Sequence, residues 1–351
     1  MQRSTVTRGL VIAVVAAFSF GSSGALLKPM FDAGWSPVAV VAARSLIGGF
    51  ALLPFALVAV RGHWPTVWRS RWRILALSVT GVSGTLLFYF LSIERIPVAT
   101  GILIEYLAPL LLVGVVWVTT RRMPHAVVLI GSAVALAGLI LVVSPFGGGT
   151  LDPLGIVFAL IAMIGCAAYY VIVARPTNGL PPVVLASFGV ILGGLTVLGI
   201  AATGILPFEV ATRDVAFAGT SVAWWVPLVT AGVLSTAIGF ATSIKATEIL
   251  GSRIASFVGL LEVVTAALYA WLLLGENLSI PQVIGGALIL AGIAFVRSDK
   301  PVVELAETSG GELVGVEDGV AVPLLGQEPL PVLGEVLVDG VARDEGVEVR
   351  R

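Results

Sequence analysis

A short glycine-containing stretch occurs twice in this chain, and it constrains the fold more than any other feature. Ile130-Gly-Ser-Ala-Val-Ala-Leu-Ala-Gly138 returns 154 positions later as Ile284-Gly-Gly-Ala-Leu-Ile-Leu-Ala-Gly292. The same offset pairs Glu94 with Glu248 and Trp117 with Trp271, and an offset of 145 pairs Gly34, Pro37, Gly48 and Gly49 with Gly179, Pro182, Gly193 and Gly194. Internal similarity over this length predicts two halves of the same structure.

The composition places the chain in a lipid bilayer. Hydrophobic residues make up 58% of the 351 residues, charged residues only 12%, and the mean hydropathy is +1.05. Soluble domains contain about 45–50% apolar residues, so a soluble globule is excluded. The sequence has no His, Cys and carboxylate cluster with metal-ligand spacing and no Gly-Lys-Ser/Thr phosphate loop. We therefore expect no metal, no cofactor and no nucleic acid partner.

Charged residues and prolines divide the apolar sequence into ten segments, each long enough for a helix to cross a hydrocarbon core of about 30 Å. The predicted fold is an all-α integral membrane protein with ten transmembrane helices. The segments are residues 9–28, 37–60, 73–93, 97–119, 124–144, 154–174, 181–204, 222–245, 252–274 and 280–297. Because the first segment has a counterpart in mid-chain, we interpret it as a helix rather than a secretory signal.

Basic residues predict the orientation, because cytoplasmic connections of membrane proteins are rich in Lys and Arg. With both termini cytoplasmic, only Lys28, Arg95 and Arg213 face outward. The cytoplasmic set is then Arg3, Arg8, Arg61, Arg69, Arg71, Arg73, Arg121, Arg122, Arg175, Lys245, Arg253, Arg297 and Lys300. Each half holds five helices, an odd number, so the second half is inverted relative to the first. Inverted repeats are typical of transporters that open one site alternately to two faces.

The repeat and a change in composition divide the chain into three parts. Residues 1–148 and 149–298 form the two five-helix repeats. Residues 299–351 carry twelve acidic side chains and few basic ones, with repeated Gly and Pro. Such a composition buries too little apolar surface to fold alone, so we expect a disordered cytoplasmic tail.

Motifs in the membrane segments match a known pattern. Arg44 lies in the second segment, Leu261-Glu262 in the ninth, and Leu272-Leu-Leu-Gly-Glu276 closes the ninth. With the two inverted repeats, these motifs resemble the drug/metabolite transporter superfamily, especially its EamA-type branch of bacterial inner-membrane exporters. The resemblance covers residues 9–297 and implies a carrier whose fourth and ninth helices border a central cavity.

Two further comparisons with that family concern the fourth and ninth helices. The family's usual Glu-Pro pair is divided here between the halves, as Glu262-Val263 and Ala108-Pro109. The stretch Glu105-Tyr-Leu-Ala-Pro109 is similar to the fourth helix of threonine/homoserine-like exporters. This similarity implies amino acids or related compounds as substrates.

Three ionisable side chains lie deep inside predicted helices: Arg44, Glu105 and Glu262. A charge at the centre of a membrane helix costs about 2.5–3.5 kcal/mol on insertion scales, so each needs a partner, water or neutralisation. We expect Glu105 or Glu262 to bind and release a coupling proton, and Arg44 to bind a substrate carboxylate. The structural alternative is an ion pair between Arg44 and a glutamate.

Aromatic and interfacial positions complete the predicted site and its surroundings. Tyr89 and Tyr106 are assigned to the substrate site, because the resemblance places their helices beside the cavity and their hydroxyls need partners. Packing in the membrane core is the alternative for both. We expect Lys28 to be an interfacial anchor that extends to water. Interfacial belt positions are predicted for Trp64, Trp68, Trp72, Trp224 and Trp225.

These features predict a multi-pass carrier of the cell (cytoplasmic) membrane that exports a small organic metabolite and is coupled to protons. Its partners are the lipid bilayer and the small-molecule substrate. A lipid-linked or nucleotide-sugar carrier is the alternative within transport, but it would need a more basic cavity than Arg44 supplies. Outside transport, a membrane enzyme acting on a lipid and a scaffold or sensor using the acidic tail remain open.

Overall fold

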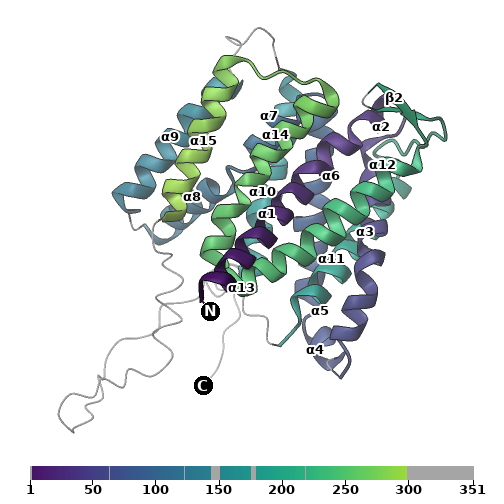
Figure 1. Ribbon diagram of the computed structural model, residues 1–351, viewed down its shortest axis with the longest axis horizontal. Coiled ribbons are helices and arrows are strands. Elements are labelled where there is room, and N and C mark those ends of the chain that lie inside the picture. Colours follow the sequence, from purple (N-terminus) through teal and green to yellow (C-terminus); the bar gives the residue numbers. More distant parts are fainter. Residues whose placement is uncertain are drawn as a thin grey trace, which may run out of the picture. The chain divides into compact units, whose positions relative to one another are not determined.

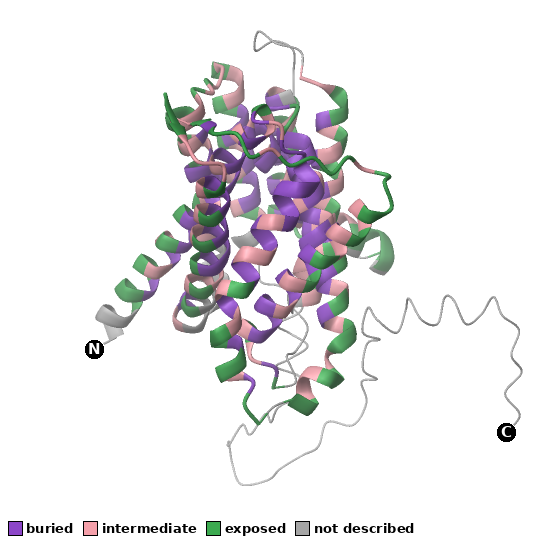
Figure 2. Cartoon of the chain, turned by 90° about the vertical axis from the view of Figure 1, so that its right-hand side faces the viewer, coloured by how far each residue is buried: buried purple, intermediate pink, exposed green. Residues whose placement is uncertain are grey.

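The computed structural model describes residues 2–62, 64–121, 123–143, 151–174, 179–217 and 219–298, and most of these residues are helical. The predicted tail, residues 299–351, lies outside them. Long helices stand side by side, with buried residues on their inward faces and exposed residues outside (Figures 1 and 2). Seven helical spans are long and apolar enough to cross a membrane, and three shorter apolar helices accompany them. The chain is a multi-pass membrane protein.

The two halves resemble each other in the order of their elements, although the second half has a β-hairpin and fewer separate helices. In the first half these are α1 (Gln2–Leu27), α2 (Pro29–Asp32), α3 (Pro37–Ala59), α4 (Trp64–Arg69), α5 (Arg71–Ala76), the π-helix η1 (Leu77–Gly84), α6 (Thr85–Ile93), α7 (Val98–Glu105), α8 (Ala108–Thr120) and α9 (Ala126–Val143). In the second half they are α10 (Pro153–Ala174), α11 (Pro182–Ala202), β1 (Val215–Phe217), β2 (Thr220–Val222), α12 (Trp225–Thr230), the π-helix η3 (Ala231–Ile238), α13 (Gly239–Gly259), α14 (Leu261–Leu274) and α15 (Ile280–Ser298).

Two π-helical segments interrupt the third and eighth membrane segments at equivalent positions. η1 and η3 each contain eight residues, and they begin at Leu77 and Ala231, the offset of the sequence repeat. The backbone N–H groups that follow them reach five residues back, from Thr85 to Thr80 and from Gly239 to Leu234. Segments of this kind are rare, and they occur frequently at functional sites.

The fourth and ninth segments are also broken at equivalent positions. α7 and α8 are separated by Tyr106 and Leu107, and α13 and α14 by Leu260. Pro109 accounts for the first break, because it cannot donate the backbone hydrogen bond that would continue α7. The connection predicted at residues 245–252 differs from expectation, since α13 remains helical through it. That stretch contains no proline to stop helical hydrogen bonding.

The prediction of an all-α fold misses a small β-hairpin between α11 and α12. β1 and β2 pair as antiparallel strands across a turn that contains Gly219, whose φ is +80°. Arg213, just before β1, donates hydrogen bonds of 2.6 and 2.7 Å to backbone carbonyls at the end of α2. Trp35 and Trp224 stack with ring centroids 5.7 Å apart. Trp224 is thus half-buried against Trp35, and its position in an interfacial belt stays a prediction.

α9 and α15, which carry the repeated glycine stretches, lie side by side at one edge of the bundle (Figure 1). Their backbones touch through reciprocal glycine pairs. A Cβ on Gly138 would lie 2.5 Å from the Gly285 carbonyl oxygen, and a Cβ on Gly131 would lie 2.7 Å from that of Gly292. Small residues permit this approach between membrane helices. The repeated motif thus forms a helix interface.

Candidate functional site

Arg44 is buried in the N-terminal half of α3 and is held by hydroxyl groups. Its guanidinium donates hydrogen bonds of 2.6 Å to Ser23 Oγ, 3.3 Å to Ser235 Oγ and 3.1 Å to Thr236 Oγ1. It also lies 5.4 Å from the centroid of the Phe90 ring. The Nε atom is buried without a hydrogen-bond partner.

No ion pair joins Arg44 to a carboxylate among the described residues. The pairs found there are Lys28 with Glu276 and Arg95 with both Glu94 and Asp152. This conformation therefore does not contain the ion pair between Arg44 and a membrane glutamate that we considered as the alternative. A buried guanidinium with only neutral partners retains the capacity to bind an anionic group bidentately.

Close approach of α3 and η3 brings the hydroxyls to Arg44. A Cβ on Gly48 would lie 2.8 Å from the Gly232 carbonyl oxygen, and a Cβ on Gly232 would lie 2.6 Å from the Ile47 side chain. Because both positions are glycine, the two backbones pack directly against each other. The π-helical turn then carries Ser235 and Thr236 to the guanidinium.

The breaks in the fourth and ninth segments place acidic side chains at the ends of half-helices. Glu105 is the last residue of α7, and Glu262 lies in the first turn of α14. Tyr106, in the break itself, donates a hydrogen bond of 2.6 Å from its hydroxyl to Glu262 Oε2. Glu105 makes no hydrogen bond or ion pair with the described residues. The two predicted carboxylates thus have different surroundings.

Gly21 of α1 allows α14 to pack closely against α1 next to the contact between Tyr106 and Glu262. A Cβ on Gly21 would lie 2.9 Å from both the Ala266 backbone nitrogen and the Glu262 carbonyl oxygen. Thr265 Oγ1 links the same helices by donating a 3.0 Å hydrogen bond to the Ala17 carbonyl oxygen. The backbone around Glu262 is therefore supported directly by α1.

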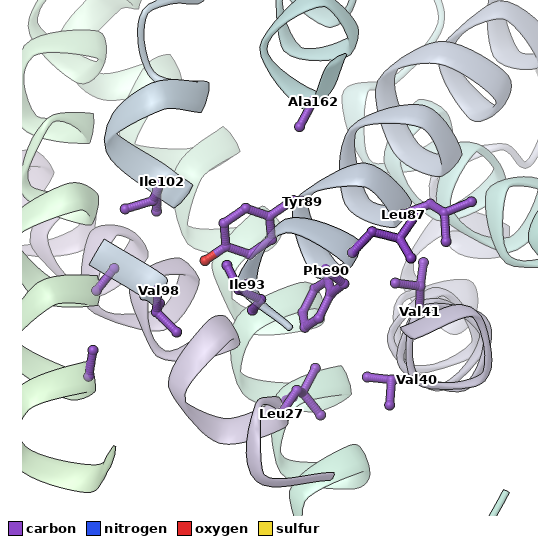
Figure 3. Packing of buried hydrophobic residues seen from close by; sticks show 14 of the residues in the cluster. Leu27, Val40, Val41, Leu87, Tyr89, Phe90, Ile93, Val98, Ile102 and Ala162 are labelled. Carbon is purple, nitrogen blue, oxygen red and sulfur yellow. The ribbon is translucent and has the colours of Figure 1, made fainter. Parts of the chain in front are cut away.

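Four of the predicted site residues share one electrostatic environment. Arg44, Tyr89, Glu105 and Glu262 are near enough for long-range electrostatic interaction, but among the described residues no hydrogen bond or ion pair joins Arg44, Tyr89 and Glu105 to one another. Figure 3 shows the Tyr89 ring beside Phe90, with its hydroxyl directed toward α7. The Tyr89 hydroxyl makes no hydrogen bond to a described residue. The region therefore combines one cation, two carboxylates and a phenol from α3, α6, α7 and α14.

A second polar contact lies just beyond the C-terminal end of α1, and the sequence did not predict it. Lys28 Nζ donates 2.6 Å to Glu276 Oε1 and 3.0 Å to the Ile96 carbonyl oxygen. Glu276 Oε2 accepts a 2.9 Å hydrogen bond from the Val98 backbone N–H, the first residue of α7. Lys28 is thus one partner of an ion pair, rather than only the anchor in water that we expected. The contact joins α1, α7 and the end of α14.

The hydroxyl partners of Arg44 were missed as well. Ser23 lies in Gly21-Ser-Ser-Gly24, a stretch whose composition indicates close helix packing, and Ser235 and Thr236 lie in an apolar run without a motif. The sequence contains no signal that assigns them to Arg44, because the contact depends on which helices meet. Among the described residues, no three His, Cys, Asp or Glu side chains gather closely enough to hold a metal ion.

The fold and this buried polar region define a multi-pass membrane transporter. The sequence profile of the EamA-like transporter family matches residues 7–144 and again 153–298. The chain belongs to the EamA-like transporter family.

Relatives support the same class. An uncharacterized inner membrane transporter of Salmonella typhimurium, YicL, is 26% identical over 307 residues, which are 84% of this chain and 96% of that protein. An uncharacterized transporter of Archaeoglobus fulgidus is 24% identical, with 80% and 93% covered. A solved crystal structure with 21% identity superposes with a TM-score of 0.52 over 82% of this chain and 96% of that chain, which shows similarity of fold.

Proposed function

We propose that this protein is a proton-coupled carrier that exports small organic metabolites, amino acids or related compounds, across the cytoplasmic membrane. Its ten transmembrane helices form two inverted repeats, with both termini cytoplasmic, and the halves rock about a midplane site. One observation carries the proposal. A buried guanidinium without a carboxylate partner lies in the same electrostatic environment as two carboxylates on other helices.

An amino acid matches both signs of charge in this region. Arg44 binds the substrate carboxylate, because its guanidinium has a free Nε and neutral hydroxyl partners that an anion can displace. Glu262, oriented by Tyr106, binds the ammonium group. Glu105 carries the exchangeable proton, because it has no donor or cation bound to it among the described residues. A carboxylate in a membrane interior is a common proton carrier in transporters.

The breaks at Tyr106 and Leu260 give the two halves equivalent flexible points. Discontinuous helices in transporters bring half-helix ends and unpaired backbone groups to the substrate. Rocking about these breaks would expose the Arg44 region first to one face of the membrane and then to the other. The π-helices η1 and η3 supply matching irregular turns on the neighbouring helices.

The test is efflux from liposomes that contain the purified full-length protein. A panel of labelled amino acids, small amines and nucleotide sugars is loaded, with and without an imposed pH gradient. We expect pH-driven efflux of amino acids, which Arg44→Gln abolishes and Glu105→Gln uncouples from the gradient. Glu94→Gln is the matched control, since it makes the same chemical change in an exposed ion pair, and it should transport normally.

Other outcomes identify the alternatives. Amino acid movement that ignores pH in the unmodified protein would indicate a facilitator and remove the role of Glu105. Efflux of nucleotide sugars alone would favour the related carrier class. If no solute moves, an enzyme acting on lipids or a sensor using residues 299–351 becomes the better interpretation.

A further inference from the structure

Residues 61–73, between α3 and η1, form a segment rich in tryptophan and arginine. The segment contains Trp64, Trp68, Trp72, Arg61, Arg69, Arg71 and Arg73, and it contains no Asp or Glu. Its helix α4 has no buried residue. In Figure 1, α4 and the N-terminus lie toward one end of the bundle, whereas α2 and β2 lie toward the other. The end that carries α4 and the N-terminus is the one that we predict to be cytoplasmic.

The three indole rings of this segment are presented outward. Trp64, Trp68 and Trp72 are 54%, 71% and 68% exposed. Apolar rings of this size are rarely left in water, but they suit the headgroup level of a bilayer, where one end of the ring is apolar and the other is wet. The ring of Trp64 also stacks on Phe188, with centroids 6.4 Å apart, which fixes the segment to α11.

Arg71 is held beside two of these rings. Its guanidinium carbon lies 5.0 Å from the ring centroid of Trp68 and 5.7 Å from that of Trp72, and Nη1 donates a 3.0 Å hydrogen bond to the Trp68 carbonyl oxygen. Arg71 and Arg69 are both exposed, and neither forms an ion pair with a described residue. Their charges are therefore available to an external anion, and a planar guanidinium matches the geometry of a phosphate.

The inverted repeat supplies an internal comparison. The counterpart of this segment is the connection between α11 and η3, residues 203–230, on the opposite face of the predicted topology. Its charged residues are Glu209, Arg213 and Asp214, and its tryptophans are Trp224 and Trp225, of which Trp225 is 52% exposed. Arg213 donates its hydrogen bonds to carbonyl oxygens within the protein. Exposed tryptophan thus occurs on both faces, but the clustering of several arginines with three tryptophans is confined to one of them.

We propose that residues 61–73 are a binding site for the phosphate headgroup of an anionic phospholipid in the cytoplasmic leaflet. Arg69 and Arg71 bind the phosphate, while the three tryptophans hold the segment at headgroup depth. Basic clusters next to a membrane helix attract anionic lipids at that leaflet. The site includes the first residues of α5, which leads into η1, so the bound lipid contacts the start of the third membrane segment. This assignment rests on the predicted orientation and is independent of the transported substrate.

Native mass spectrometry of the full-length protein, titrated in detergent with phosphatidylglycerol or phosphatidylethanolamine, tests the site. Two surface arginines are expected to change affinity for an anionic lipid about 10- to 30-fold. Arg69→Gln with Arg71→Gln should therefore lose most of the preference for phosphatidylglycerol. Arg8→Gln with Arg121→Gln removes the same charge from exposed positions on the same predicted face and should change this preference much less, because neither arginine belongs to residues 61–73.

A further pair of variants separates phosphate recognition from simple charge. Arg69→Lys with Arg71→Lys keeps the charge and the fold, and it should weaken binding at least several-fold, because lysine lacks the planar fork. Equal binding of the two lipids to the unmodified protein, or equal losses in the test and control pairs, would overturn the proposal. Displacement of the lipid by millimolar glycerol phosphate would also overturn the proposal, because it would identify a soluble phosphate as the ligand.

Discussion

The ion pair between Lys28 and Glu276 gives a quantitative prediction that does not depend on the substrate. The two side chains are 25% and 15% exposed, and their charged atoms are 2.6 Å apart. Exposed ion pairs contribute about 0.2–1 kcal/mol, whereas removing one partner from a buried pair costs about 3–5 kcal/mol. Glu276 also accepts from the first N–H of α7, and an acid at a helix N-terminus adds about 0.3–1 kcal/mol. We expect Glu276→Gln to lower the free energy of unfolding by about 2 kcal/mol.

A double-mutant cycle isolates the pair from the other contacts of each side chain. The cycle compares the unmodified protein with Lys28→Met, Glu276→Gln and the double variant. Their unfolding in mixed detergent micelles is monitored by tryptophan fluorescence. We expect a coupling energy of about 1–2 kcal/mol that persists in salt, because a half-buried pair is screened weakly. The matched control is the cycle for Arg95 and Glu94, whose side chains are 31% and 32% exposed. A coupling at Lys28 and Glu276 no larger than in that control would refute the reasoning.

Three further predictions concern other parts of the chain. Tyr106→Phe removes the hydroxyl that donates a 2.6 Å hydrogen bond to Glu262. In the same unfolding assay it should lower the free energy of unfolding by about 1.5–3 kcal/mol, whereas Tyr89→Phe should change it little. Gly138→Ala places a Cβ 2.5 Å from the Gly285 carbonyl oxygen and should lower the free energy of unfolding by about 1–3 kcal/mol. Gly114→Ala should be tolerated, because nothing lies within 4 Å of a Cβ at that position. Truncation after residue 298 should leave efflux intact; loss of transport would contradict a passive tail.

The helices could be predicted from sequence because hydrophobic length and charged boundaries are local properties. The predicted segments overlap observed helices. The repeated glycine stretches predicted two similar halves, but only the structure shows that the helices carrying them, α9 and α15, pack against each other. The β-hairpin could not be predicted in this way. Its strands contain three residues each, and it is held by Arg213 and Trp35, contacts with residues far away in sequence.

The candidate site was predicted only in outline. Arg44, Glu105 and Glu262 could be predicted as site residues because charge in a membrane helix is costly. Glu105 is also near a helix-breaking residue, Pro109. The environment of each charge was beyond the sequence, because it depends on which helices meet. Ser235 and Thr236 reach Arg44 only because glycines allow α3 and η3 to touch.

The two halves share their backbone irregularities but differ in their side-chain chemistry. η1 and η3, and the breaks at Tyr106 and Leu260, occupy equivalent positions. The repeat offsets pair Arg44 with Gly189, Glu262 with Ala108, and Glu276 with Arg122. In the proposed alternating-access cycle, identical inverted halves would give two conformations that are related by a two-fold axis and have equal energy. Because each of these charges occurs in one half only, we expect the two conformations of the proposed cycle to differ in free energy, and the backbone symmetry alone does not determine which of them is more populated.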